Sequence, residues 1–443
     1  MRKRAVARRP SDPRTPVGEA GTCGCDRVSF GRNVIANVAV QWLGPASAFL
    51  TVFVVARLGG PTAQGEYAQL RAWIDLLVAV GSLGLPQGII YVINVLGASP
   101  GRLEQWSRRW ALGVLPIAFL ASLGAARAGL LTDPGAAAAA MVAGTAAILV
   151  LHSLWRGIYL TRFSGARFAL FTILPAVAAL AGVAWAMRAG EPRLERALLL
   201  ASLPVVAISF LAMRAIPGPT PAEPAALPWR PLFVNGIHAL AQSLLMTAQP
   251  LAAYAFVRHA GGSPREVGFL NAGLFLVQGL TVPVSMIAPL LFVRWTASAD
   301  PEFVSSLRRA TPRLLALGAA GGVALAAVVG VVVRVVFGAS YAPAIPAAQA
   351  VMLTLPLVVH LRVVAPAMHA RGHPEVNTSG GFLRLGTFVL AALVLQRSLP
   401  PELAAAVAWS IAEVLASAWI LRALYVLGGA ASLEAGASAG GTR

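Results

Sequence analysis

Residues 313–336 read RLLALGAAGGVALAAVVGVVVRVV. Twenty consecutive residues without a charged side chain lie between the two arginines of this stretch. The hydrocarbon core of a bilayer is about 30 Å thick, and a helix that rises about 1.5 Å per residue crosses it in roughly 20 apolar residues. This stretch is therefore predicted to be a membrane-spanning helix.

Similar apolar runs recur along almost the whole chain of 443 residues, of which 57% are hydrophobic and 12% are charged. A soluble protein carries about 25% charged residues, so much of this surface must face lipid. Closed β-barrels, the other spanning architecture, would show shorter and alternating segments. The chain is therefore predicted to be an all-α, polytopic membrane protein with twelve spans, at residues 34–56, 73–96, 110–129, 137–160, 168–188, 196–215, 232–257, 267–291, 313–336, 347–368, 380–396 and 403–427.

Polar segments divide the chain into five predicted parts. Residues 1–30 are rich in Arg, Pro, Gly and Ser, and residues 428–443 are rich in Gly, Ala and Ser, so both are expected to be disordered tails. Residues 216–231 form the segment richest in proline and are expected to link two lobes of six helices each. The lobes are predicted at residues 31–215 and 232–427.

The distribution of basic residues predicts the orientation in the membrane. With the N-terminus in the cytoplasm, segments on that side carry 24 Arg and Lys residues, and segments on the other side carry 10; Arg362 lies within a span. Cytoplasmic loops of membrane proteins are enriched in Arg and Lys. Both termini are therefore expected in the cytoplasm, and the net charge of +18 indicates this loop bias rather than a nucleic-acid partner.

An internal repeat with a spacing of 203 residues joins the two predicted lobes. The turn at residues 58–68 (LGGPTAQGEYA) is similar to the turn at residues 259–272 (HAGGSPREVGFLNA), and Gly65 and Gly268 are 203 residues apart. Six spans separate the two copies, so both cross the membrane in the same direction. Parallel repeats of this kind are typical of transporters.

Several short motifs resemble those of polysaccharide (Wzx-type) flippases, which belong to the multidrug/oligosaccharidyl-lipid/polysaccharide (MOP) exporter superfamily. The resemblance covers about residues 31–427. It rests on residues 54–68 (VVARLGGPTAQGEYA), 81–88 (GSLGLPQG), 267–273 (VGFLNAG), 336–342 (VFGASYA) and 368–374 (MHARGHP).

The resemblance implies a fold and an activity. The fold would be two six-helix lobes around a central cavity. The activity would be alternating-access flipping of a polyprenyl-pyrophosphate-linked oligosaccharide, such as an O-antigen precursor of lipopolysaccharide, across the bacterial inner membrane. It implies no cofactor. The implied partners are the lipid bilayer, a coupling cation (H+ or Na+), and a polysaccharide polymerase or glycosyltransferases.

Two ionisable residues lie deep within predicted spans, Arg362 in the tenth and Glu413 in the twelfth. An ionisable residue inside a span is costly and is a functional candidate for that reason. Two hypotheses remain open. The two residues form a structural pair, or Arg362 faces a cavity and binds pyrophosphate while Glu413 binds a proton or cation.

Two further groups of residues are candidates for a substrate-binding cavity. The first group lies near the outer end of the two repeated hairpins and comprises Arg57, Arg71, Asp75 and Arg258. These side chains either extend to the membrane–water interface or form a cavity rim that attracts anions. The second group falls close to one face of the seventh span and comprises Asn235, His238, Gln242 and Gln249. These side chains either bind sugar hydroxyls in a cavity or form hydrogen bonds to neighbouring helices.

Catalytic and metal-binding patterns do not occur in the sequence. There is no phosphate-binding loop, nucleophile elbow or HExxH motif, and Cys23 and Cys25 are too few for a metal site. The chain is predicted not to be an enzyme. Two alternatives to the flippase remain: a cation-coupled multidrug antiporter of the same fold, and an integral-membrane enzyme of polysaccharide biosynthesis.

Overall fold

The structure, a computed structural model, describes residues 27–133, 135–162, 166–191, 193–214, 228–297, 302–370 and 373–440. Most of the predicted tail at residues 1–30 and of the predicted linker at residues 216–231 lies outside these ranges. Within them the chain is helical and contains no strand.

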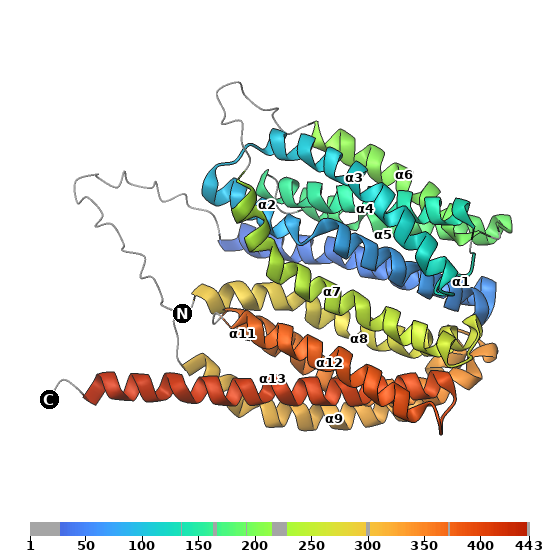
Figure 1. Ribbon diagram of the computed structural model, residues 1–443. Coiled ribbons are helices and arrows are strands. Elements are labelled where there is room, and N and C mark those ends of the chain that lie inside the picture. The colour runs from blue at the N-terminus through green and yellow to red at the C-terminus, as the bar shows by residue number, and fades with distance from the viewer. Residues whose placement is uncertain are drawn as a thin grey trace.

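Two groups of helices lie side by side in Figure 1. The N-terminal group comprises α1 (Arg27–Ser82), α2 (Leu85–Leu96), α3 (Pro100–Arg127), α4 (Ala136–Arg162), α5 (Ala166–Ala189) and α6 (Leu194–Met213). The C-terminal group comprises α7 (Trp229–His259), α8 (Pro264–Ala297), α9 (Glu302–Val336), the 3-10 helix η1 (Ala339–Ala344), α10 (Ile345–Met352), α11 (Leu355–Ala370), α12 (Pro374–Leu395) and α13 (Pro401–Gly440). Helices α1 and α2 contact α7 and α8 across the boundary between the groups.

Helix α1 contains two spans. Its backbone is non-helical at Gly60 (φ 73°, ψ −170°), a conformation that glycine adopts at little cost. The chain reverses direction there, as Figure 1 shows. We call the end of the molecule with this reversal and the turn between α7 and α8 the hairpin end. The opposite end, where α2 ends and α7 begins, is the tail end.

The helices agree with the spans expected from the sequence. Among the described residues, nine helices are long and apolar enough to cross a membrane. One of these stretches, Trp42–Leu96, has 55 residues and holds both spans of the first hairpin. Helix α6 continues through Pro204. Helix α13 continues to Gly440, beyond residue 427, where we expected the last span to end.

The predicted tenth span, 347–368, is not one straight helix. It is divided between α10 and α11, and the segments Ala339–Met352 and Leu355–Ala365 are bent by 45°. Pro356 lies in the first turn of α11. Its ring has no N–H to continue the preceding helix and crowds the carbonyl four residues earlier, which accounts for the break.

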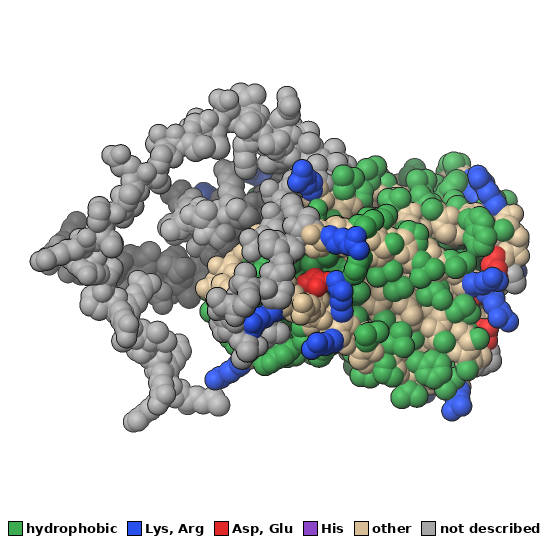
Figure 2. All heavy atoms as spheres, turned by 90° about the horizontal axis from the view of Figure 1, so that it is seen from above, with side chains coloured by type: hydrophobic (Ala, Val, Ile, Leu, Met, Phe, Trp, Pro, Cys, Tyr) green, Lys and Arg blue, Asp and Glu red, His purple; other side chains and the backbone are tan. Residues whose placement is uncertain are grey.

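The outer surface is suited to lipid. Leu112, Leu317 and Val394 are 71%, 73% and 70% exposed, far more than such side chains would be in a soluble core. Figure 2 shows hydrophobic side chains along the middle of the body, with Lys and Arg side chains toward its two ends. Charged ends that flank an apolar band are the arrangement that a bilayer requires.

At the hairpin end, the two groups of helices touch through their backbones. A Cβ atom on Gly65 would lie 1.7 Å from the carbonyl oxygen of Pro264, and one on Gly268 would lie 2.0 Å from that of Pro61. Pro61 and Pro264 show the same 203-residue spacing as Gly65 and Gly268. The repeat found in the sequence therefore forms a reciprocal contact, which we call the hairpin-end contact.

At the tail end, a second contact joins the groups. A Cβ atom on Gly88 would lie 2.0 Å from the carbonyl oxygen of Leu232 at the start of α7. Nearby, the rings of Trp106 on α3 and Trp229 on α7 have centroids 5.3 Å apart. The two groups of helices therefore touch at both ends of the molecule.

Candidate functional site

Four polar side chains from four helices meet in the interior of the C-terminal group. They are Gln249 on α7, Arg362 on α11, Arg384 on α12 and Glu413 on α13. We call them the charge cluster. An apolar membrane body rarely contains such residues unless they are paired or functional.

Glu413 forms an ion pair with Arg384. Its Oε1 atom lies 3.3 Å from Nε of Arg384, and the two side chains are 5% and 23% exposed. The other carboxylate oxygen of Glu413 is buried and accepts no hydrogen bond from a described residue. Gln249 lies close enough to interact with this carboxylate, and its buried amide nitrogen donates no hydrogen bond within the described residues.

Arg362 is half-buried and forms no hydrogen bond or ion pair with any described residue. It is attracted by Glu413 and repelled by Arg384. Of the two arginines, Arg384 forms the ion pair with Glu413, whereas Arg362 interacts with this carboxylate over a longer distance. With two guanidinium groups and one ionised carboxylate, the charge cluster would have a net charge of +1.

Arg384 was missed as an interior residue because its helix begins earlier than expected. The predicted eleventh span began at residue 380, which placed residue 384 near the membrane surface. Helix α12 begins at Pro374, so Arg384 is ten residues into the helix. The chain preceding residue 380 is more polar than a typical span, and hydropathy alone did not indicate that it continues the helix.

Arg57 and Arg258, the repeat-equivalent arginines, both bind backbone carbonyl groups, Arg57 at the C-terminal end of α9 and Arg258 in the turn that follows α7. Arg57 donates hydrogen bonds across the two groups of helices, from Nε to the carbonyl of Val336 at 2.8 Å and from Nη2 to that of Val335. Arg258 donates from Nη1 to the carbonyl of Gly262 at 3.1 Å. A cation at a helix C-terminus satisfies free carbonyls and is stabilised by the helix dipole.

The remaining candidates are not gathered into one site. Arg71 and Asp75 pair with each other on α1, with Nη2 of the arginine 2.9 Å from the carboxylate. Gln242 is half-buried on α7, two helical turns before Gln249. The side chains of Asn235 and His238 lie outside the described part of the structure.

Replacing Glu413 by leucine should destabilise the protein, because Arg384 would lose its ion-pair partner and half-buried Arg362 would lose a nearby anion. Removing one partner of a buried ion pair costs about 3–5 kcal/mol, and the partial exposure of Arg384 places the expected loss near the lower limit. The thermal unfolding midpoint of the purified protein in detergent measures this loss. Glu375→Leu, at an exposed carboxylate of the tail end, is the control. An unchanged midpoint for Glu413→Leu would contradict the prediction.

The described residues contain no group of three His, Cys, Asp or Glu side chains placed to hold one metal ion. The charge cluster instead offers guanidinium N–H donors and one carboxylate. Guanidinium groups bind carboxylate and phosphate oxygens in a bidentate manner. Its chemistry therefore suits an anionic group.

The sequence matches no protein-family model and no curated protein. Its fold is similar to solved transporters. One is an inward-facing multidrug resistance MATE family transporter of the MOP superfamily, with a TM-score of 0.67, 15% identity, and coverage of 88% of this chain and 99% of that one. Another is the lipid II flippase MurJ in an inward closed conformation, with a TM-score of 0.68, 12% identity, and coverage of 88% and 87%.

A third similar structure is a MOP superfamily transporter from Pyrococcus furiosus, with a TM-score of 0.59, 14% identity, and coverage of 90% of this chain and 96% of that one. At these identities the likeness concerns the fold, and it extends over nearly all of each protein. The chain is therefore a helical, polytopic membrane protein whose fold is similar to that of MOP superfamily transporters.

Proposed function

We propose that this chain is a flippase that moves a polyprenyl-pyrophosphate-linked oligosaccharide, or a related polysaccharide precursor, across the cytoplasmic membrane. The observation that carries the proposal is Arg362, a half-buried arginine inside the membrane body. It forms no ion pair with a described residue, and the nearby carboxylate of Glu413 is paired with Arg384. A transporter of a lipid diphosphate needs positive charge where the headgroup crosses the apolar core.

Arg362 binds the pyrophosphate in this proposal, and Arg384 adds a second positive charge. A guanidinium keeps its charge at every working pH and matches two phosphate oxygens at once. Glu413 balances part of the positive charge in the empty state. Gln242 and Gln249, with Asn235 and His238, supply hydrogen bonds to the sugar.

In this proposal, alternating access uses the two contacts between the groups of helices. The hairpin-end contact and the tail-end contact open in turn, so that the charge cluster is reached from one side at a time. With both termini in the cytoplasm, as the Arg and Lys distribution favours, the hairpin end faces the periplasm. In this orientation Arg57 stabilises periplasmic closure, because its hydrogen bonds join α1 to α9.

A cation-coupled multidrug antiporter is the second candidate. The buried carboxylate oxygen of Glu413 accepts no hydrogen bond from the described residues, and this favours the antiporter, since a proton or Na+ would satisfy that oxygen. The two candidates share this coupling role for Glu413 and differ in the cargo. An organic cation carried by such an antiporter would be repelled by Arg362 and Arg384. For this reason we place the flippase first.

Deleting the gene in its host and analysing polyprenyl-linked glycans by mass spectrometry tests the proposal. We expect a completed lipid-linked oligosaccharide to accumulate on the cytoplasmic face and to disappear when the wild-type gene is restored. An unchanged lipid pool together with new sensitivity to cationic drugs would support the antiporter. A pool that stops one sugar short would indicate an enzyme of polysaccharide biosynthesis.

A further inference from the structure

A cavity of about 320 Å³ lies at the hairpin end, within the N-terminal group of helices and separate from the charge cluster. Its polar lining comes from three places in the chain. Glu66 and Gln69 lie on α1, just after the reversal at Gly60. Thr132 and Asp133 lie in the turn between α3 and α4, and Arg193 and Glu195 lie at the start of α6.

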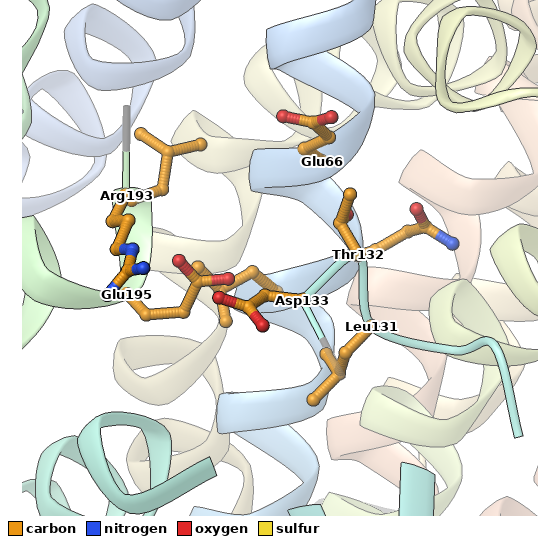
Figure 3. A pocket seen from close by; sticks show the side chains of 9 residues that line it. Glu66, Leu131, Thr132, Asp133, Arg193 and Glu195 are labelled. Atoms are coloured by element: carbon orange, nitrogen blue, oxygen red, sulfur yellow. The ribbon is translucent and has the colours of Figure 1, made fainter. Parts of the chain in front are cut away.

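The cavity is acidic in a strongly basic protein. Three of the 17 acidic residues of the chain line it, opposed by a single arginine, Arg193, whereas the whole chain has a net charge of +18. Figure 3 shows the carboxylates of Asp133 and Glu195 near each other, with Arg193 beside Glu195 and Glu66 across the cavity. With all four groups ionised, the lining would carry a net charge of −2.

Two polar side chains in the lining, Glu66 and Gln69, lack a strong partner among the described residues. The Glu66 carboxylate forms no hydrogen bond or ion pair with a described residue, and the arginine that attracts it, Arg258, donates to the carbonyl of Gly262. Gln69 is only 3% exposed, and its amide makes no hydrogen bond within the described part of the chain. Gln69 lines the cavity, so a ligand there that hydrogen-bonds to its amide would be stabilised.

The carboxylates lie on two sides of the cavity. Among the described residues, no three acidic or His side chains converge closely enough to hold one metal ion. Glu66 lies across the cavity from Asp133 and Glu195 (Figure 3), so a ligand that satisfies both sides must span the space between them. Leucine side chains from all three lining segments supply an apolar wall: Leu70, Leu131 and Leu194.

We propose that this cavity binds a small linear organic dication of the diamine class. One ammonium group donates hydrogen bonds to Glu66 and to the amide oxygen of Gln69. The other donates to Asp133 and Glu195, and the methylene chain between them packs against the leucines. A volume of about 320 Å³ is within the range of small-molecule sites and accommodates four or five methylene groups with their charged ends.

Titration calorimetry with 1,4-diaminobutane and the full-length protein in lipid nanodiscs tests this proposal. We expect saturable binding with one site per chain, weakened by added salt because the contacts are ionic. Butylamine, which has the same chain length but one charge, should bind about tenfold more weakly or worse. Equal affinity for the two amines, or no saturable binding of the diamine, would overturn the proposal.

Isosteric variants identify the cavity as the binding site. Glu66→Gln and Glu195→Gln each remove one negative charge with little change of shape, and each should weaken diamine binding by about tenfold or more. Gln69→Leu should also weaken binding without altering charge, so it provides a second route if a Glu variant does not fold. Glu375→Gln, at the tail end, is the control and should bind as the wild type does. Wild-type affinity in all three cavity variants would place the diamine elsewhere and refute the assignment.

The outcome is independent of the cargo of the transporter. The cavity is formed by α1, α6 and the α3–α4 turn, whereas the charge cluster is formed by α7, α11, α12 and α13. Diamine binding could therefore be found whether or not the chain flips a lipid-linked oligosaccharide, and failure of either proposal leaves the other to be judged on its own measurement.

Discussion

Gly65→Leu should abolish export while the protein still inserts and folds. A Cβ atom at this position would lie 1.7 Å from the carbonyl oxygen of Pro264 and 2.8 Å from the amide nitrogen of Gly268, and both neighbours are backbone atoms. The leucine can be accommodated only if α1 and α8 separate at the hairpin end. Overpacking of this kind costs about 1–3 kcal/mol, which shifts the balance between closed and open states by roughly 5- to 150-fold.

The separation of the hairpin end can be measured directly. Spin labels at Leu58→Cys on α1 and His259→Cys on α7, with Cys23 and Cys25 replaced by serine, report the distance between the two groups of helices. Pulsed electron paramagnetic resonance should show a longer distance in Gly65→Leu than in the parent. Gly113→Leu is the matched control, because a Cβ atom on that exposed glycine of α3 meets no atom within 4 Å. An unchanged distance together with normal export would refute the role of the hairpin-end contact.

Arg362→Gln should reduce export by roughly ten- to 150-fold and leave thermal stability unchanged. The expected loss corresponds to the ~1.5–3 kcal/mol that a hydrogen bond to a charged group contributes, here between the guanidinium and a phosphate of the substrate. Stability should not fall, because Arg362 makes no hydrogen bond or ion pair with the described residues. Export is measured as in the gene-deletion experiment, by complementation, and stability is measured as the unfolding midpoint in detergent.

Comparison with two other arginines separates substrate binding from structural support. Arg384→Gln should lower both export and the unfolding midpoint, because Arg384 pairs with buried Glu413. Arg362→Lys should export at an intermediate rate, since lysine keeps the charge but cannot bind phosphate in the same bidentate geometry. Arg397→Gln, at an exposed arginine of the hairpin end, is the control. Normal export by Arg362→Gln would remove the proposed anion site but would not by itself refute the flippase.

The sequence was sufficient to predict the class of fold and the positions of most helices. A span is a property of about 20 neighbouring residues, and hydropathy summed over such a window reports it directly. The stretch at residues 313–336 is an example, since α9 ends at Val336, where the prediction placed its end. The 203-residue repeat was also visible, because the turns that carry it contain glycine and proline at matching positions.

The boundaries that failed lie where a polar segment continues a helix or a single proline interrupts one. Helix α12 begins six residues before the predicted span, which moved Arg384 from the surface into the interior. The tenth span is bent next to Pro356, where a missing N–H outweighs a continuous apolar run. Window averages do not detect either effect.

The sequence by itself determined that this protein is a helical membrane protein with a duplicated hairpin, because hydropathy and turn residues act over short stretches of chain. Only the tertiary structure decided that Glu413 pairs with Arg384, that Gly65 meets Pro264, and that Glu66, Asp133 and Glu195 share one cavity. Such partners depend on the rotation and relative height of neighbouring helices. The helix surfaces consist of similar Ala, Val and Leu side chains, so the rotation and height of each helix are set only by the packing of the whole molecule.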